Sequence, residues 1–322
     1  MKIKTLSEYI SMLEREGLLV SVMGQAGSAT FIDVKGVSYN SILSGEGTLF
    51  ICKGANFKVQ YLKDALEKGA VACVTEENAS WLSQFEEVLD LVPVLVVSNI
   101  RRAISRISAM YYDRSWDEGL KLVGLTGTKG KSTTATMIKS ILDVHCGREI
   151  GFSSGIYNYD GQNREKSVLT TPETIELHRI LDNCVKNNCR YLVMEVSSQA
   201  LKYDRTLDLN YEVCGFLNIS EDHISEAEHK DMEDYFTSKM KILDQSRIAC
   251  INQDMDPEYL GRVLEEAVKK CEKTVTFGFG EGADVRGLSV KELPGKLILS
   301  VCIRKESTGV YEYEFTVNIG GI

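Results

Sequence analysis

Hydrophobic residues along this chain form short continuous apolar runs that alternate with amphipathic stretches of helical period. In the amphipathic stretch at residues 4–18, Leu6, Ile10, Leu13 and Leu18 fall near one face. The pattern before residue 113 predicts helices at 4–18, 60–69 and 101–112, and strands at 31–34, 48–52, 70–75 and 92–97. We therefore expect a small N-terminal α/β domain at 1–113 and a second domain at 114–322.

The second region alternates strands and helices more regularly. Strands are predicted at 122–126, 191–196, 213–219 and 248–252, and helices at 131–144, 174–188 and 232–245. This order is typical of a mostly parallel sheet that helices cover on both faces. After residue 271, short β segments at 274–278, 297–304 and 310–317 predict a β-rich extension. The predicted fold class is α/β.

The most specific chemical signal follows the apolar strand at 122–126. The chain there continues as Gly127-Thr128-Lys129-Gly130-Lys131-Ser132-Thr133 and then enters a helix. In such a loop the glycines let backbone N–H groups approach phosphates, Lys131 meets the terminal phosphates, and Ser132 can hold Mg²⁺. The usual P-loop pattern has a further glycine where Leu125 stands, so the match is to a shorter variant. The alternative is an ordinary β-turn-α junction with a surface lysine, but we predict ATP and Mg²⁺ binding.

Composition narrows the class of protein. The 322 residues are 43% hydrophobic and 26% charged, which is typical of a globular protein of about two domains. No apolar run reaches transmembrane length, and the N-terminus does not look like a signal peptide. Nine cysteines without Cys-x-x-Cys pairs argue against a disulfide framework or a zinc site, so we expect a cytoplasmic location. A net charge of −9 argues against nucleic-acid binding.

The phosphate loop and four later segments together resemble the Mur ligases, most closely their muramoyl-tripeptide synthetase branch. The segments are Leu169-Thr170-Thr171-Pro172-Glu173, Met194-Glu195-Val196-Ser197-Ser198-Gln199-Ala200-Leu201 with Arg205, Asn218-Ile219-Ser220-Glu221-Asp222-His223, and Tyr235-Phe236-Thr237-Ser238-Lys239. The resemblance implies ATP-dependent amide formation in peptidoglycan precursor synthesis, in which an acyl phosphate forms and the third stem amino acid joins UDP-MurNAc-L-Ala-D-Glu. It does not tell which amino acid is added.

The resemblance also implies how the molecule is organised. Residues 1–113 would bind UDP-MurNAc and 114–322 would bind ATP, while a third domain, absent from this chain, would bind the incoming amino acid. We therefore expect this fragment alone to be inactive as a ligase. The expected partners are small molecules only, without nucleic acid or membrane insertion, and the expected state is a monomer.

The expected site has a nucleotide part and a metal part. The nucleotide would contact Gly127, Thr128, Lys129, Gly130, Lys131, Ser132, Thr133 and Asn218. Mg²⁺ ions would be held by Ser132, Glu195, His223 and Lys239, with Lys131, Lys239 and His223 in catalytic roles. At Glu195 we favour a metal ligand over an ion pair with a nearby lysine, because hard cations need oxygen ligands. The resemblance makes Lys239 a carbamylated lysine, whereas its residue pattern alone favours a solvated helix lysine such as Lys241.

The acceptor substrate would contact Thr170, Thr171, Ser197, Tyr203, Arg205 and Ser41. Arg205 fits two roles equally well, recognition of a carboxylate or phosphate and a surface ion pair. Two positions depart from the family pattern, since Gln199 stands where a histidine is common and Tyr203 where a glutamine is found. Of the remaining histidines, His229 is expected to face solvent, and His145 and His178 are expected to be structural.

Two alternatives remain open. A sister enzyme of the folylpolyglutamate or poly-amino-acid synthetase type would share the phosphate loop, although the Thr170-Thr171-Pro172 and Ser197-Ser198 segments favour the muramoyl branch. A nucleotide-binding module without catalysis of its own is the other alternative.

Overall fold

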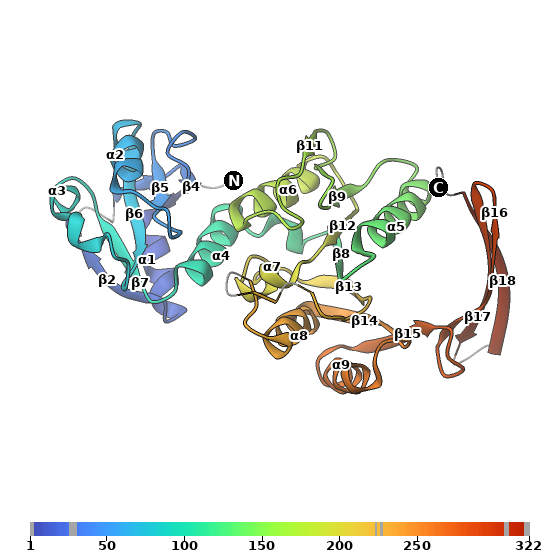
Figure 1. Cartoon of the computed structure of the whole chain (residues 1–322). Coiled ribbons are helices and arrows are strands. Elements are labelled where there is room, and N and C mark those ends of the chain that lie inside the picture. The colour runs from blue at the N-terminus through green and yellow to red at the C-terminus, as the bar shows by residue number, and fades with distance from the viewer. Residues whose placement is uncertain (1–2, 26–30, 223, 226–227, 306–308, 319–322) are drawn as a thin grey trace. The chain divides into compact units, whose positions relative to one another are not determined.

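Two groups of elements, each with its own sheet, make up the computed structural model, which describes residues 3–25, 31–222, 224–225, 228–305 and 309–318 (Figure 1). Unit 1 consists of Met1–Gly119, Pro172–Asn188 and Tyr203–Asp208. Unit 2 consists of Leu120–Thr171, Cys189–Lys202 and Leu209–Ile322. The segment that carries Arg205 therefore belongs to unit 1, although its sequence neighbours belong to unit 2.

Unit 1 contains a five-stranded sheet in the order β2-β7-β6-β5-β4, parallel except for β2. Its strands are β1 (Lys4–Thr5), β2 (Leu19–Met23), β3 (Asp33–Val34), β4 (Gly36–Ser38), β5 (Thr48–Ile51), β6 (Ala70–Glu76) and β7 (Val94–Val97). Its helices are α1 (Leu6–Arg15), α2 (Val59–Glu67), α3 (Glu86–Leu89), α4 (Ile100–Tyr111) and α6 (Thr174–Lys186). The short strands β1 and β3 pair separately.

Alternate side chains of the unit 1 strands enter two different cores, which explains their continuous apolar sequence. On β5, Leu49 and Ile51 pack with residues of α1 and α4, whereas Phe50 packs with residues of α2. The helix predicted at 4–18 is shorter than expected. Residues 4–5 pair with β3, the Thr5 amide donates to Glu8 Oε2 (2.8 Å), and the helix ends before Gly17, whose φ is +66°.

Unit 2 is built on an eleven-stranded sheet in the order β11-β10-β9-β12-β8-β13-β14-β15-β16-β17-β18. Its strands are β8 (Lys121–Thr126), β9 (Gly151–Ser153), β10 (Tyr157–Tyr159), β11 (Arg164–Lys166), β12 (Tyr191–Glu195), β13 (Tyr211–Phe216), β14 (Ser246–Asn252), β15 (Lys273–Gly278), β16 (Val285–Leu293), β17 (Lys296–Lys305) and β18 (Gly309–Asn318). Its helices are α5 (Lys131–Cys146), α7 (Ser198–Lys202), α8 (Met232–Met240) and α9 (Pro257–Lys270).

The centre of this sheet, from β9 to β16, is parallel, and both ends are antiparallel. The predicted α/β class, with a mostly parallel sheet and a β-rich extension, is confirmed. The helix predicted at 232–245 is α-helical only to Met240 and continues as a 3₁₀ turn over Lys241–Gln245. Carboxyl ends of parallel strands share one edge, so β8, β12 and β13 deliver their loops to a common region.

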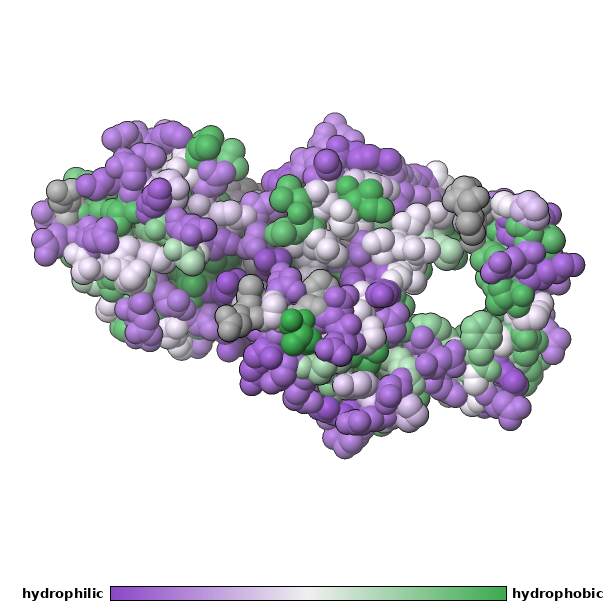
Figure 2. Space-filling model, viewed as in Figure 1, coloured by the Kyte–Doolittle hydropathy of each residue, from purple (hydrophilic) through white to green (hydrophobic). Residues whose placement is uncertain are grey.

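The β-rich extension leaves apolar side chains in contact with solvent. Figure 2 shows hydrophobic surface on strands β16 to β18, where the exposed side chains include Val290, Val310, Tyr311, Tyr313 and Phe315. None of the helices that the structure describes combines the length and the apolar character needed to cross a membrane.

Candidate functional site

The loop between β8 and α5 has a backbone that requires its glycines. Gly130 has φ +82° at the start of α5, and a Cβ on Gly127 would lie 3.0 Å from Leu217 Cβ. The Nζ of Lys131 donates to the carbonyl oxygens of Gly127 (2.8 Å) and Thr128 (3.0 Å). Burial lowers the pKa of Lys131, against the opposing charge of Glu195. The loop thus presents a partly desolvated cation at a helix N-terminus.

Asn218, just after β13, fixes the shape of this loop from the neighbouring strand. Its Oδ1 accepts from the amides of Thr128 and Lys129, both at 2.9 Å, and its Nδ2 donates to the carbonyl of Lys129 (3.0 Å). In addition, the amide of Ser220 donates to Thr128 Oγ1 (3.1 Å). The contact of Asn218 in this structure is therefore with the loop backbone.

Lys239 on α8 is buried, with 1% of its surface exposed. Its Nζ donates to the carbonyl of Gly127 (2.9 Å) and lies 4.4 Å from the centre of the Tyr235 ring. Burial, followed by the nearby charge of Lys131, lowers the pKa of Lys239 to about 7. By contrast, Lys241 is exposed, and its Nζ donates to the carbonyl of Leu201 (3.2 Å). The two lysines of α8 and its following turn thus have opposite environments.

Glu195 ends β12 and is 2% exposed. Its Oε1 accepts from the amide of Gly155 (2.9 Å). Within the described ranges, no three His, Cys, Asp or Glu side chains come together as a metal cluster. His223 lies outside the described residues, so its predicted metal role has no structural test here. The available donors are oxygens, those of Glu195 and Ser132, which suit Mg²⁺.

Ser132 and Thr133 border an open cavity of about 840 Å³ along α5. Its other walls come from Ile156 and from strands β17 and β18, including Leu299 and Phe315. The start of the phosphate loop helix is therefore accessible within unit 2.

Thr171 and Ser197, predicted as substrate residues, lie together in unit 2. Thr171 Oγ1 donates to the carbonyl of Glu195 (3.0 Å) and accepts from the amide of Ser197 (3.0 Å). Thr170 is half-buried, and its Oγ1 lies 3.6 Å from the place that a Cβ on Gly155 would take. These hydroxyls therefore surround the same strand end as Glu195.

The other three predicted substrate residues belong to unit 1. Arg205 is 9% exposed, and its guanidinium forms an ion pair with Glu173 Oε1 (2.5 Å). Burial alone would raise the pKa of Glu173, but the charges of Lys53 and Arg205 hold it below its usual value. The Arg101 guanidinium stacks 3.9 Å from the centre of the Tyr203 ring. The carbonyl of Ser41 accepts from the Nζ of Lys68 (2.8 Å).

The expectation that His229 faces solvent is wrong. His229 is fully buried, and its Nε2 lies 2.9 Å from Ser198 Oγ. The surrounding run of charged residues predicts exposure, whereas contacts with Ser198, Asp234 and Tyr235 bury the ring. The local sequence pattern carries no signal of these contacts. His178 is also buried, with its ring 4.5 Å from that of Trp116, as a structural residue should be, and His145 is exposed.

Comparison with known proteins gives consistent matches. A sequence family described as the Mur ligase middle domain matches residues 125–318. The chain is 41% identical over 221 residues to the UDP-N-acetylmuramyl-tripeptide synthetase of Lactococcus lactis subsp. cremoris (strain MG1363), covering 68% of this chain and 43% of that protein. It is 35% identical over 274 residues to the UDP-N-acetylmuramoyl-L-alanyl-D-glutamate--L-lysine ligase of Enterococcus faecalis (strain ATCC 700802 / V583), covering 83% and 52%. The chain thus spans about half the length of the curated relatives it matches.

Solved structures show the same fold. The structure of a UDP-N-acetylmuramoyl-L-alanyl-D-glutamate--2,6-diaminopimelate ligase superimposes with a TM-score of 0.72 at 17% identity, over 97% of this chain and 59% of that one. A UDP-N-acetylmuramoylalanyl-D-glutamyl-2,6-diaminopimelate--D-alanyl-D-alanyl ligase from Acinetobacter baumannii gives 0.60 at 18% identity, over 100% and 62%.

Proposed function

Because the chain belongs to the Mur ligase family, we propose that it works in ATP-dependent amide formation during peptidoglycan precursor synthesis. The acceptor would be UDP-MurNAc-L-Ala-D-Glu, and the product would carry the third stem amino acid. The observation that most supports this proposal is the convergence of Lys131 and Lys239 on the carbonyl of Gly127 in the phosphate loop. We further propose that the protein acts in the cytoplasm as a monomer, with residues 1–113 binding UDP-MurNAc and residues from 114 onward binding ATP.

The proposed reaction has two steps. A carboxylate oxygen of the acceptor attacks the γ-phosphorus of ATP, ADP leaves, and an acyl phosphate forms. The amine of the incoming amino acid then attacks the acyl carbon, phosphate leaves, and the amine loses a proton. Neither step needs a protein nucleophile, so the protein contributes orientation and charge neutralisation.

The residues of the phosphate loop supply most of that neutralisation. Lys131 would exchange its bonds to the loop carbonyls for bonds to phosphate oxygens, with the amides of residues 127–133 around it. Asn218 would act through the loop backbone that it already holds. Thr170, Thr171 and Ser197, which lie near Glu195 in unit 2, are proposed contacts of the acceptor. Ser41, Tyr203 and Arg205 are also proposed contacts of the acceptor.

Mg²⁺ is the proposed metal, held by Ser132, Glu195, His223 and a modified Lys239. When bound, the metal offsets the negative charge of the phosphates. The buried carboxylate of Glu195 at the end of β12 supports this assignment.

We propose that Lys239 carries a carbamate. The ammonium first loses one proton. The neutral amine then adds to CO₂: the N–C bond forms, one C=O π bond of CO₂ breaks, and a second proton leaves, so that a cation has become a carboxylate. A pKa of about 7 supports this chemistry, because much of the amine is then neutral near neutral pH. An unmodified ammonium at this position would instead repel Mg²⁺.

Thermal unfolding of this chain with candidate acceptors tests the proposal. A ligand that binds only the folded protein, at about 100 times its dissociation constant, adds about 2.7 kcal/mol to stability. We expect UDP-MurNAc-L-Ala-D-Glu to raise the melting temperature and dihydrofolate to leave it unchanged. Stabilisation by dihydrofolate alone would favour a folylpolyglutamate-type ligase. Stabilisation by MgATP with neither acceptor active would favour a nucleotide-binding module.

A further inference from the structure

A buried polar network joins helices α7 and α8 at a place that the proposed reaction does not use. His229 is its centre, with Nε2 2.9 Å from Ser198 Oγ on α7 and Nδ1 3.4 Å from Asp234 Oδ2 on α8. The His229 ring also packs edge-on against Tyr235, with centroids 5.1 Å apart. The Nε2 contact is a hydrogen bond, whereas Nδ1 makes no hydrogen bond with the described residues and lies only within ion-pair distance of Asp234. A fully buried histidine with these contacts to two elements is positioned to fix the spacing of those elements.

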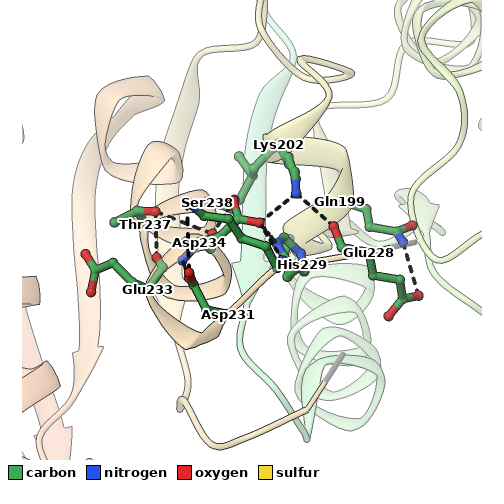
Figure 3. Close-up of polar contacts among 12 residues, drawn as sticks. Gln199, Lys202, Glu228, His229, Asp231, Glu233, Asp234, Thr237 and Ser238 are labelled. Carbon is green, nitrogen blue, oxygen red and sulfur yellow. Dashed lines mark hydrogen bonds and ion pairs between the residues drawn. The ribbon is translucent and has the colours of Figure 1, made fainter. Parts of the chain in front are cut away.

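The same network includes the ammonium group of Lys202. Figure 3 shows Lys202 reaching between Glu228 and Asp234, with His229 beside them. The Nζ of Lys202 donates to Asp234 Oδ2 (2.6 Å) and to the carbonyl of Glu228 (2.8 Å). At its rim, Gln199 Nε2 donates to Glu228 Oε1 (3.1 Å). Ser198 and Lys202 are the first and last residues of α7, so both ends of this short helix make contacts within the network.

Both helices, α7 and α8, are close in sequence to residues of the candidate site or carry them. α7 follows Glu195 by two residues, and the intervening Ser197 is bonded to Thr171. α8 carries Lys239, which bonds to Gly127, and Tyr235, whose hydroxyl donates to Thr128 Oγ1 (3.2 Å). The network therefore lies between the carboxylate at the end of β12 and the lysine beside the phosphate loop.

The order Ser198–His229–Asp234 resembles a hydrolytic triad, but the burial of Ser198 argues against a nucleophile. Ser198 is only 5% exposed, and His229 is covered completely. Burial lowers the pKa of His229 even though Asp234 opposes this, so the ring is neutral at neutral pH. A neutral ring carries one proton, so in the tautomer with that proton on Nδ1, the nitrogen nearer Asp234, Nε2 accepts the hydroxyl hydrogen of Ser198.

We propose that His229 is a positioning residue, which holds Ser198 and Asp234 so that Glu195 and Lys239 keep the separation that Mg²⁺-dependent nucleotide binding requires. The proposal rests on the proposed function for the identity of the ligand. It also separates two contributions to nucleotide binding. The loop around Lys131 binds phosphate without help from α7, whereas the metal-dependent part needs both helices in register.

Calorimetric titration of this chain with ADP, in excess Mg²⁺ and then in EDTA, tests the proposal. The variants are His229→Gln and Ser198→Ala. The control is Thr237→Val, which removes an exposed hydroxyl on α8 that donates to the Glu233 and Asp234 carbonyls of its own helix. We expect each test variant to weaken MgADP binding about tenfold, the effect of losing one buried hydrogen bond. Affinity in EDTA should stay within about twofold of wild type, since the phosphate loop is unchanged. The double variant should bind no more weakly than the weaker single variant, because both remove the same interaction.

Several results would overturn the proposal. Equal losses of affinity with and without Mg²⁺ would show a general structural role. Wild-type affinity for MgADP in Ser198→Ala, which removes only one hydroxyl, would show that the network has no role in binding. The melting temperature of each variant establishes that it is folded during titration. If the wild-type chain binds MgADP and both variants bind it with the same affinity, this inference alone is overturned. A wild-type chain that binds no MgADP overturns the proposed function together with it.

Discussion

Lys239 has the environment that a carbamate requires, a buried amine whose pKa is lowered to about 7. The amine is neutral above this pKa, so carbamylation should increase as the pH rises from 6 to 8. With ¹³C-labelled bicarbonate, we expect a carbamate resonance in the NMR spectrum of the wild-type chain and none in Lys239→Ala.

The matched control for this experiment is Lys269→Ala, since Lys269 is an exposed lysine paired with Glu265 (2.8 Å). Lys241 is less suitable, because it caps the carbonyl of Leu201. A carbamate resonance that persists in Lys239→Ala, or disappears equally in Lys269→Ala, would contradict the assignment.

His178 should make unit 1 sensitive to acid. Burial, followed by the charge of Arg114, lowers its pKa to about 3, whereas an unfolded histidine titrates near 6.5. Between these values only the unfolded chain binds the proton, so stability falls as the pH drops through this window, by up to about 1.4 kcal/mol per pH unit. His178→Phe, which keeps a ring against Trp116, should therefore lose about 2 kcal/mol less than wild type between pH 7 and pH 5.

Urea unfolding followed by tryptophan fluorescence checks this prediction, because Trp81 and Trp116 are the chain's two tryptophans and both belong to unit 1. His145→Phe is the control, since His145 is exposed, and it should lose as much stability as wild type. An identical acid loss in His178→Phe and wild type would contradict the account.

The individual site residues differ in how far the sequence could predict them. The phosphate loop is local, so the spacing of Gly127, Gly130 and Lys131 carries the prediction by itself. The environment of Lys239 depends on which side of α8 faces the phosphate loop, and that of His229 on its contacts with α7 and α8. Both are decided by contacts between segments that are far apart in the sequence. For this reason the pattern at Lys239 alone favours a solvated lysine, and the prediction that His229 faces solvent is wrong.

At the scale of elements, the centre of the unit 2 sheet depends on close approach between β8 and β13. A Cβ on Gly124 would lie 2.7 Å from Tyr211 Cε1, and both residues are buried. Gly124→Ala should therefore lower the free energy of unfolding by about 1–3 kcal/mol. Urea unfolding followed by circular dichroism measures this loss.

Gly261 in α9 provides a control with the same change and no steric cost. Apart from the nearby backbone of α9 itself, no heavy atom of the described residues lies within 4 Å of the position of its added Cβ, so Gly261→Ala should leave stability unchanged or raise it by up to about 1 kcal/mol. A Gly124→Ala chain as stable as Gly261→Ala would show that the strands can separate without cost.

Among the longer elements, β8, α5, β12 and α6 were predictable, whereas the 14-residue helix α9 was not predicted. The short strands β9, β10 and β11 were not, because three residues carry too little periodicity to identify a strand. The change from α-helix to 3₁₀ turn after Met240 was also missed, since the apolar spacing continues through both.

At the scale of the whole molecule, the α/β class can be predicted from the alternation of strands and helices. Which segments belong to which of the two units cannot be predicted in this way. Pro172–Asn188 and Tyr203–Asp208 belong to unit 1 although they interrupt unit 2 in sequence. Long-range contacts decide this grouping, among them the Glu173–Arg205 ion pair and the Trp116–His178 stack. Composition and local pattern contain no signal for such an exchange of segments.

The central claim is that the loop at 127–133 binds MgATP through Lys131, and calorimetric titration of this chain with MgATP tests it most directly. Wild type should bind, and Lys131→Ala should bind about tenfold or more weakly, because it loses a charge-assisted bond to phosphate. Lys269→Ala should match wild type. Equal affinity in wild type and Lys131→Ala, or no binding by wild type, would contradict the claim.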